Sequence, residues 1–536
     1  MKDLHTSATE ARQLDEAGRL LEAKSYQEAH ALCLAVLNAN PGSARAYYLL
    51  GVMAADHGGH RKAIELFDRA LAIDGQHSGA LTQKARSLIA RLERSQAVDM
   101  ANRAAALQPE DPFTLVTLGV VFSRAGLHER AVPFYAAATA ARPDDPAFHY
   151  NHGAALQFIG RMDEARKAYE ACVALAPNNT WALSALTQIR KQTPDDNELP
   201  RLEAAFEATS ADADDALRVG HALAKAHEDL GNADDALDWL KKAKAAKWAA
   251  IRYDPAADEA LFATARHLAG ALRGKSGQAG PAPIFIVGMP RTGTTLIDRI
   301  LSSHSLVTSG GELADFGMAL KRLSGTQSNK VLDQETLAAA ERVDLSALGR
   351  TYAESVRSTL GLEGRFIDKL PLNILYAPAI LAALPDARVI CLRRHPADTV
   401  LSNYRQLFAT RFPYYDYAYD LEACARYYVG FDRMVAHYSE VLPPDRFRQV
   451  RYEQVVGDIE TETRALLDFC GLEFEPACVS FHENTAPVAT ASSAQVREPL
   501  YTRSLARWKR YEAGLKPALD ILEAAGCLDP DERSPK

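Results

Sequence analysis

The sequence has no long apolar run, little excess charge and few cysteines, and each absence excludes a class of protein. No stretch approaches the ~18 consecutive apolar residues that a membrane-spanning helix needs. Lys plus Arg number 61 and Asp plus Glu number 69, so the formal net charge is −8. A mildly acidic chain is a poor candidate for general binding to nucleic acid or membrane surfaces. Any anion site must therefore be built locally, from a few basic side chains and backbone amides.

The seven cysteines are odd in number and scattered, and no CxxC pair suggests zinc or redox chemistry. The opening MKDLHTSATEARQLDEAGRL lacks an apolar core and does not read as a secretory signal. We therefore expect reduced thiols in a cytoplasmic protein, although Cys470 and Cys478 could pair if the chain were exported.

The first third of the chain repeats with a period of 34 residues. Chain breakers and two sets of small residues recur at that interval, at Pro41, Gly75, Pro109, Pro143 and Pro177, at Ala29, Ala63, Ala97, Ala131 and Ala165, and at Gly51, Ala85, Gly119 and Gly153. Small side chains allow two helices to cross closely, and the breaker ends the second helix. The period therefore predicts a series of helical pairs.

These residues resemble the tetratricopeptide repeat (TPR) over about residues 10–190. A further unit is expected at HALAKAHEDLGNADDALDWLKKAKA, after an irregular insert at about 191–216. The resemblance implies an all-α helical array over residues 1–272, whose concave surface binds a protein or peptide partner. Support of the next domain, or self-association, is an alternative role for the array.

The run RGKSGQAGPAP at 273–283 is rich in Gly, Pro and Ser and is expected to be a linker. After it, apolar β-type runs alternate with amphipathic helices, which predicts an α/β domain with a parallel sheet at 284–536. In PIFIVGMPRTGTTLIDRILSSH, a strand leads into a Gly-rich turn and then into a helical pattern. This order is typical of a phosphate cradle, because backbone amides and a helix N-terminus favour an anion.

The turn departs from GxxxxGK[ST], the loop that binds nucleoside triphosphates. Gly288 and Gly293 keep its spacing and Thr295 fills its last position, but Thr294 replaces the Lys that reaches the β- and γ-phosphates. The departure disfavours hydrolysis of ATP or GTP, and Arg291 offers a different cation.

The run GMPRTGTTLIDRILSSHSLVTSGGEL closely resembles the 5′-phosphosulfate loop of sulfotransferases, especially that of the tyrosylprotein sulfotransferases. The resemblance covers about residues 283–510 and implies a P-loop-like domain that uses 3′-phosphoadenosine 5′-phosphosulfate (PAPS) as donor and needs no metal. The loop residues that it assigns to PAPS binding are Pro290, Arg291, Thr292, Gly293, Thr294 and Thr295.

A second segment, ARVICLRRHPADTVLSNY, has a short apolar strand that ends in Arg393 and Arg394 rather than in a magnesium-binding carboxylate. Arginine suits bidentate phosphate recognition, and Ser402 follows on a helix that Pro396 can start. The resemblance implies that Arg394 and Ser402 bind the 3′-phosphate of the donor. Arg393 is expected to be a solvated surface charge.

Two further segments resemble nucleotide contacts of the family. QVRYEQVVGD places Tyr452 near the nucleotide, and SSAQVREPLYTRSLARW resembles the loop that closes over it. Ser492 and the run through Tyr501 match the start of this loop, and Arg507 stands where the family usually has Lys. That exchange keeps the charge but changes its geometry.

Sulfuryl transfer needs an in-line acceptor hydroxyl, a base for its proton, and cations for the leaving phosphate. Glu312 in SGGEL is the candidate base, and the KxP segment in FIDKLPLNILY places Lys369, by resemblance, beside the bridging oxygen. Lys369 and Arg291 would neutralise the leaving group, and Ser492 would donate to a sulfuryl or bridging oxygen. Alternatively, Glu312 could cap the next helix and Lys369 could be a salt-bridge partner.

The chain also departs from the animal tyrosylprotein enzymes. The run from Leu313 to Met318 lacks their basic residues for acidic peptides, and Asp315 would repel such a substrate. Another family Arg is Gln406 here, although Arg405 is adjacent. The donor is therefore better supported than the acceptor, which could be a hydroxyl on a protein tyrosine, another peptide site, a glycan or a small metabolite.

The aromatic stretch RFPYYDYAYDLEACARYY at 411–428 is either a wall for the acceptor or a helix that packs its Tyr face. Two other function classes stay open. One is a nucleotide kinase, which Thr294 and the strand-end arginines disfavour. The other is a non-catalytic scaffold that binds partners through its repeats and only retains a nucleotide fold; donor binding without turnover would support it.

Overall fold

The computed structural model describes residues 8–91, 93–328, 330–410, 413–484, 500 and 504–529. The chain forms two compact units, Met1–Ser210 and Ala211–Lys536. In the described ranges, no helix has both the length and the apolar character that a membrane crossing requires.

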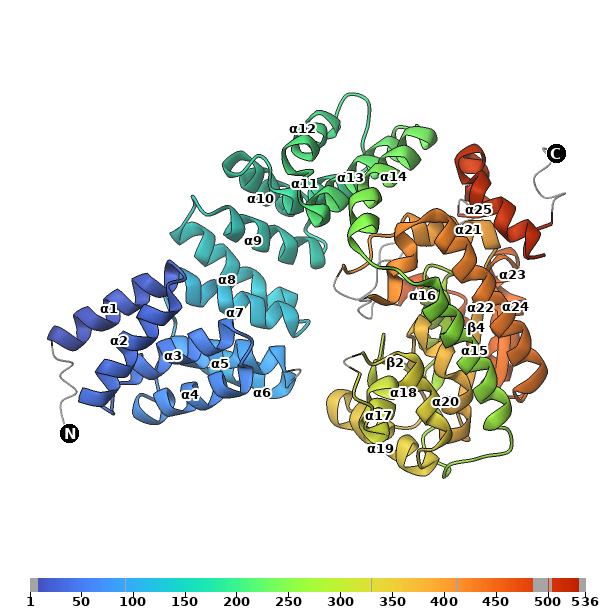
Figure 1. The fold of residues 1–536 in the computed structure, drawn as a ribbon, viewed down its shortest axis with the longest axis horizontal. Helices are drawn as coiled ribbons and strands as arrows, with labels where there is room; N and C mark the ends of the chain where they lie inside the picture. Colours follow the sequence, from blue (N-terminus) through green and yellow to red (C-terminus); the bar gives the residue numbers. More distant parts are fainter. Residues whose placement is uncertain are drawn as a thin grey trace. The chain divides into compact units, whose positions relative to one another are not determined.

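The first unit is entirely helical in its described residues, and its helices follow one another as packed pairs (Figure 1). Its helices are α1 (Ala8–Glu22), α2 (Tyr26–Ala39), α3 (Ala44–Asp56), α4 (His60–Ile73), α5 (Ser78–Ala90), α6 (Arg94–Ala106), α7 (Pro112–Arg124), α8 (His128–Ala141), α9 (Pro146–Phe158), α10 (Met162–Leu175), α11 (Thr180–Ile189) and α12 (Leu199–Thr209).

The 34-residue period has a direct physical cause in these pairs. Gly51 on α3 lies under the ring of Phe67 on α4, where an added Cβ would come within 2.5 Å of the ring. Gly119 on α7 lies under Tyr135 on α8 in the same way, with 2.6 Å to an added Cβ. The glycine of the first helix thus makes room for an aromatic ring of the second. The predicted helical repeat is confirmed.

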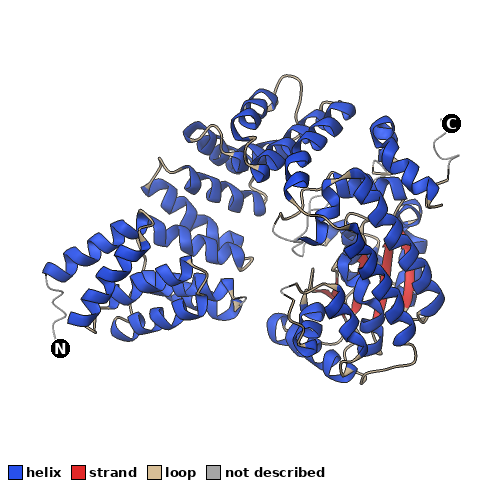
Figure 2. Cartoon of the chain, viewed as in Figure 1, coloured by secondary structure: helices blue, strands red, loops and turns tan. Residues whose placement is uncertain are grey.

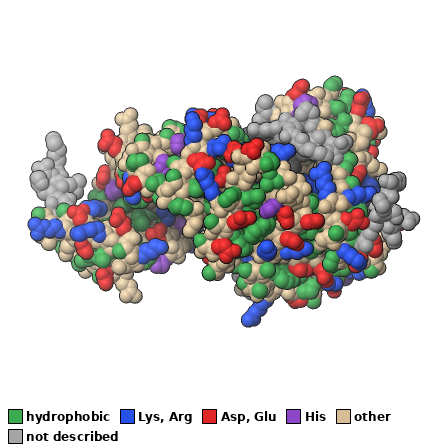
Figure 3. All heavy atoms as spheres, turned by 90° about the horizontal axis from the view of Figure 1, so that it is seen from above, with side chains coloured by type: hydrophobic (Ala, Val, Ile, Leu, Met, Phe, Trp, Pro, Cys, Tyr) green, Lys and Arg blue, Asp and Glu red, His purple; other side chains and the backbone are tan. Residues whose placement is uncertain are grey.

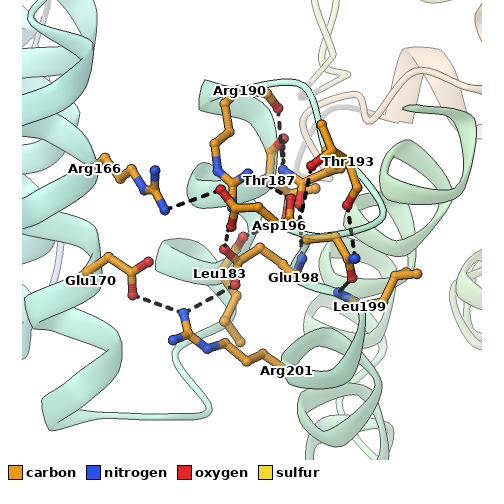
Figure 4. Close-up of polar contacts among 12 residues, drawn as sticks. Arg166, Glu170, Leu183, Thr187, Arg190, Thr193, Asp196, Glu198, Leu199 and Arg201 are labelled. Atoms are coloured by element: carbon orange, nitrogen blue, oxygen red, sulfur yellow. Dashed lines mark hydrogen bonds and ion pairs between the residues drawn. The ribbon is translucent and has the colours of Figure 1, made fainter. Parts of the chain in front are cut away.

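The segment that interrupts the period contains α12, and a network of charged side chains holds it to the preceding repeat (Figure 4). Arg190 binds Asp196 at 2.5 Å, and Arg201 binds Glu170 at 2.9 Å. The buried Glu198 accepts hydrogen bonds from both arginines, at 3.4 Å and 3.2 Å. Because a buried carboxylate needs such partners, this network fixes the turn after α11.

The second unit contains a five-stranded sheet in the order β2-β3-β1-β4-β5, and all of its strand pairs are parallel (Figure 2). The strands are β1 (Ile284–Gly288), β2 (Thr308–Ser309), β3 (Phe366–Asp368), β4 (Arg388–Arg393) and β5 (Phe447–Arg451). The helices are α13 (Ala213–Asp229), α14 (Ala233–Ala250), α15 (Pro255–Ala271), α16 (Thr294–Ser302), α17 (Asp315–Ser324), α18 (Gln334–Ala338), α19 (Leu345–Leu360), α20 (Ala377–Ala383), α21 (Pro396–Tyr404), α22 (Leu421–Val441), α23 (Tyr452–Gly457), α24 (Ile459–Phe469) and α25 (Glu512–Ala524), with short 3₁₀ helices that include η2 (Pro371–Tyr376), η3 (Pro413–Tyr419) and η7 (Arg507–Tyr511).

Both faces of the sheet are covered, as the continuous apolar run of β1 requires. Phe285 and Val287 belong to one core, together with side chains of α15, α17, α19, α20 and α22. Ile284 and Ile286 point to the other face and pack with α16, α23 and α24. The predicted fold class, an all-α array followed by an α/β domain with a parallel sheet, is confirmed.

The helices that precede the predicted linker share the core of the sheet. Leu237 and Leu240 on α14, and Phe262 and Leu268 on α15, are buried in the same apolar cluster as Phe285. The compact unit accordingly begins at Ala211, before the expected linker at 273–283. The domain boundaries drawn from the sequence stay predictions.

Candidate functional site

The predicted site residues follow the carboxyl ends of all five strands. β1 leads into the loop 290–295, and Glu312, Lys369, Arg394 and Tyr452 come shortly after the ends of β2, β3, β4 and β5. Because the strands are parallel, these ends meet at one edge of the sheet. That edge is where open α/β sheets bind their ligands.

The loop after β1 reverses direction through two left-handed residues. Arg291 has φ +66° and Gly293 has φ +105°, and α16 begins directly afterwards. Thr292 is buried, and its Oγ1 donates to the carbonyl of Met289 at 2.8 Å. A non-glycine residue in the left-handed region is strained and is often found at a functional site. The loop thus has the strand–turn–helix context of an anion site.

Two contacts brace this loop from other elements. An added Cβ at Gly293 would come within 2.5 Å of the Tyr452 ring, so the glycine permits that ring to pack on the loop. Asn403 on α21 donates from Nδ2 to the carbonyl of Pro290 at 2.8 Å and accepts from the Tyr417 hydroxyl at 2.9 Å. Asn403 was not among the residues predicted from the sequence, and its only sequence signal is its place beside Ser402.

Arg394 connects the loop after β1 with the ends of β4 and β5. Its guanidinium lies 4.9 Å from the centre of the Tyr452 ring, and its Nη1 donates to the carbonyl of Arg291 at 3.4 Å. Nη2 donates to the carbonyl of Ser504 and lies 3.9 Å from Asp398 Oδ2. The side chain is 9% exposed. The structure therefore brings the Arg394 guanidinium to the backbone of the loop at Arg291.

The start of α21 is tied to the segment that follows residue 504. Asp398 accepts the backbone N–H of Trp508 at 2.9 Å, and burial raises the pKa of this carboxyl. The Trp508 ring stacks on His395, with 5.5 Å between centroids and 6° between planes. Glu453 in turn accepts the backbone N–H of His395 at 2.8 Å. Ser402 lies half-buried on the same helix.

Glu312 and Lys369 form an ion pair, with 2.5 Å between Oε1 and Nζ. The Lys369 side chain is 1% exposed, whereas that of Glu312 is 46% exposed. The backbone N–H of Lys369 donates to the carbonyl of Gly311 at 2.8 Å, which fixes the two segments side by side. Ala314 is the N-cap residue of α17 and makes no side-chain cap hydrogen bond, and the hydrogen bond that Glu312 accepts comes from Lys369.

A buried carboxylate stabilises the two segments that carry the Glu312–Lys369 ion pair. Asp368, next to Lys369, is fully buried and accepts the Tyr352 hydroxyl at 3.0 Å. It also accepts the backbone N–H of Leu313, the residue after Glu312. Burial raises the pKa of Asp368 well above its ordinary value. Asp368 thus holds both chain segments that carry the ion pair.

The structure contradicts the prediction that Arg393 is a solvated surface charge. Its side chain is only 18% exposed and forms an ion pair with Asp432. It also donates to Gln449 Oε1 at 3.2 Å, and its guanidinium lies 5.5 Å from the centre of the Phe431 ring. The prediction was wrong because the Arg393 side chain, on the last residue of the buried strand β4, packs on α22. The apolar stem of an arginine favours such packing.

Of the three residues predicted in the closing loop, the structure describes one. Ser492 and Tyr501 lie outside the described residues. Arg507 is described, and its Nη2 donates to Glu228 Oε2 on α13 at 3.2 Å.

The aromatic stretch 411–428 is largely a packing element in its described part. Tyr417 and Tyr427 are buried and stack with 3.8 Å between ring centroids. Tyr415 is half-buried against Phe408, with 4.3 Å between centroids. These contacts favour the packing role over an acceptor wall for most of the stretch.

Acidic and basic side chains are interspersed on the face that Figure 3 shows. Across the described ranges, no group of three or more His, Cys, Asp or Glu side chains is arranged to hold a metal ion.

Comparison with known proteins bears on both units. Residues 283–476 match the family model described as "Sulfotransferase family", and residues 14–78 and 116–180 match that of the tetratricopeptide repeat. Both resemblances seen in the sequence are thereby confirmed.

Similar proteins include an uncharacterized protein of Aquifex aeolicus, 29% identical over 380 residues that cover 69% of this chain and 49% of that protein. The protein-tyrosine sulfotransferase of Drosophila melanogaster is 26% identical over 257 residues, which cover 45% of this chain and 51% of that enzyme. The chain thus spans about half the length of these two relatives. The sulfotransferase domain of the Synechococcus PCC 7002 olefin synthase is 20% identical, with a TM-score of 0.34 over 48% of this chain and 98% of that domain.

Proposed function

We propose that this chain, which joins tetratricopeptide repeats to a sulfotransferase-like domain, transfers a sulfuryl group from PAPS to an acceptor hydroxyl. The observation that carries the proposal is the meeting of a phosphate-type loop, two arginines and a Glu–Lys pair at one edge of a parallel sheet. Each group comes from the end of a different strand, which is the usual way for such a fold to build a site.

The donor would lie along this edge. The loop from Pro290 to Thr295 and the N-terminus of α16 would hold the 5′-phosphosulfate, with Arg291 adding a full positive charge. Arg394 and Ser402 would hold the 3′-phosphate. The low exposure of Arg394 supports this role, because a cation that is partly withdrawn from water binds phosphate more strongly.

The chemical step is a direct displacement at sulfur. The acceptor oxygen forms a bond to sulfur while Glu312 takes its proton, and the bond from sulfur to the bridging oxygen breaks. The electron pair of that bond stays with the 5′-phosphate, and Lys369 and Arg291 stabilise the charge that develops there. Ser492 is proposed as a further donor in this step. No metal is needed for any part of it, because side-chain cations serve the leaving group.

The exposed fractions of the Glu312 and Lys369 side chains suit their proposed roles as base and as cation. Glu312 is 46% exposed and can be reached by an acceptor from solvent, whereas the buried Lys369 acts where water screens its charge little. The 2.5 Å contact keeps base and cation within one hydrogen bond of each other, so both can face the same sulfuryl group.

The acceptor is proposed as a hydroxyl of a peptide, a glycan or a small metabolite, with protein tyrosine among the candidates. An acidic peptide fits poorly, because Asp315 follows Glu312 at the start of α17. The repeats are proposed to bind a protein or peptide partner, since large apolar side chains stay exposed on them, among them Phe113 (52%) and Trp181 (55%).

The test is the Glu312→Gln variant, which keeps the size of the side chain but removes the base. We expect donor affinity and melting temperature to stay near the wild-type values, and kcat to fall by roughly 10²–10⁴-fold. Glu363→Gln, an exposed acid before β3, is the matched control and should change nothing. Single-turnover rates with labelled donor and a panel of acceptors measure the effect. A rate within about threefold of wild type would mean that the base lies elsewhere.

A further inference from the structure

A buried acid on α13 forms a charged cluster with residues far along the chain. Glu228 forms an ion pair with Arg405, accepts from Arg507 Nη2 at 3.2 Å, and accepts the Tyr511 hydroxyl. Its side chain is 11% exposed, whereas those of the two arginines are 20% and 35% exposed. The cluster therefore joins α13 to the end of α21 and to η7.

Arg507, and Gln406 beside Arg405, are positions at which the sequence departs from the sulfotransferase pattern that it resembles. Arg405 stands next to Gln406, which replaces a family Arg, and Arg507 replaces a family Lys. Both of them meet one acid that lies before residue 283, where the sulfotransferase-family match begins.

Two cations around one anion leave the cluster with a net positive charge. Burial by itself would raise the pKa of Glu228, but Arg405 and Arg507 lower it below the ordinary value, so the carboxylate is ionised. Burial and the neighbouring Arg405 lower the pKa of Arg507. Without Glu228, two partly buried guanidinium groups would face each other without an anion, and at least one would turn away.

The cluster is linked to the residues assigned to the 3′-phosphate through two neighbouring segments. Arg405 ends the helix that carries Ser402. In the other segment, Trp508 follows Arg507 and donates its backbone N–H to Asp398, which lies 3.9 Å from Arg394. A substitution at Glu228 is therefore expected to shift both the end of α21 and the segment of Arg507 and Trp508, which are linked to Ser402 and to Arg394.

We propose that Glu228 is a positioning residue for recognition of the donor's 3′-phosphate, because it holds Arg405 and Arg507 where their excess positive charge can receive that group. The inference rests on the proposed function. It makes α13, a helix outside the family match, part of the donor site.

The experiment compares two nucleotides that differ only in the 3′-phosphate. Calorimetry on the full chain measures Kd for 3′-phosphoadenosine 5′-phosphate and for adenosine 5′-phosphate, in wild type, Glu228→Gln and Asp229→Asn. Asp229 is the matched control, since it lies next on α13 and forms an ion pair with Lys225 on the same helix. Glu228→Gln should weaken the bisphosphate by roughly tenfold, the effect of one lost charge-assisted contact, and leave the monophosphate unchanged. Asp229→Asn should change neither.

Three further measurements separate positioning from a merely structural role. In an Arg507→Ala background, Glu228→Gln should cause a smaller further loss of the preference for the bisphosphate than in wild type, because only Arg405 is still held by Glu228. Tyr511→Phe removes only the hydroxyl that donates to Glu228 and should reduce the preference in the same direction, which keeps the test valid if Glu228→Gln does not fold. A lower melting temperature with an unchanged ratio of the two Kd values would overturn the inference. If wild type itself shows no preference for the bisphosphate, the proposed donor is wrong and the inference fails with it.

Discussion

The removal of every residue before 275 is expected to unfold the sheet domain, although the sequence suggests a self-contained domain after the 273–283 linker. Four large side chains of the two removed helices α14 and α15 are buried in the core of the sheet: Leu237 is 1% exposed, Leu240 2%, Phe262 3% and Leu268 0%. Gly430 and Gly514 mark how closely these helices approach, because added Cβ atoms would come within 2.6 Å of Phe262 and 2.3 Å of Leu237.

The magnitude follows from those four side chains. Loss of each from a packed core costs about 2–5 kcal/mol, so together they contribute roughly 8–20 kcal/mol. A whole domain is stable by only about 5–15 kcal/mol. The fragment 275–536 would therefore have little or no net stability, whereas the fragment 211–536 keeps the complete core.

The assay compares these two fragments by thermal unfolding, followed by circular dichroism, and by binding of 3′-phosphoadenosine 5′-phosphate. Fragment 211–536 should unfold cooperatively and bind the nucleotide, whereas 275–536 should be insoluble or show no transition. If 275–536 unfolds cooperatively within about 5 °C of the longer fragment, α14 and α15 are peripheral and the reasoning is refuted.

Four other outcomes are expected. Lys369→Met should lower kcat by about 10²–10³-fold in single-turnover assays, with little change in melting temperature, because its partner Glu312 is half exposed and can be hydrated. Asn403→Leu should weaken donor binding about tenfold in calorimetry, since the Pro290 carbonyl loses its hydrogen bond. Burial lowers the pKa of Lys244 to about 7. The unfolded chain, in which the lysine pKa is about 10.4, binds more protons between these values, so stability should rise from pH 7 toward pH 10. Denaturant unfolding at several pH values should show this rise in wild type and a smaller one in Lys244→Met. If the repeats recruit the acceptor, fragment 211–536 should show a raised KM on the true acceptor with kcat retained, whereas unchanged kinetics would rule out recruitment.

Local patterns predicted most of the fold. The 34-residue period follows from close helix contacts such as that of Gly51 with Phe67, which recur at Gly119 with Tyr135 and at Gly153 with Tyr169. Strands β1 and β4 were predictable because each contains an apolar run, and a Gly-rich turn follows β1. The predicted linker is a local pattern too, but the compact unit begins at Ala211 because packing of α14 and α15 on the sheet leaves no local signal.

Residues of the candidate site could be predicted only where they directly follow a strand within a recognisable motif. Lys369 and Arg394 could be named from motifs, but the contact of Lys369 with Glu312 joins positions far apart in sequence. The environment of Arg393 depends on α22, and that of Glu228 depends on α21 and η7. The sequence around a charged residue does not show whether the side chain is solvated or pairs with a residue on a distant helix. Only the tertiary fold distinguishes the two cases.

The most direct test of the account is a calorimetric titration of the full chain with 3′-phosphoadenosine 5′-phosphate and with ATP, both without magnesium. The bisphosphate should bind far more tightly than ATP, and Arg394→Ala should lose about 2–3 kcal/mol of that affinity, the scale of a charge-assisted contact. Equal affinity for ATP, or binding that requires magnesium, would contradict it.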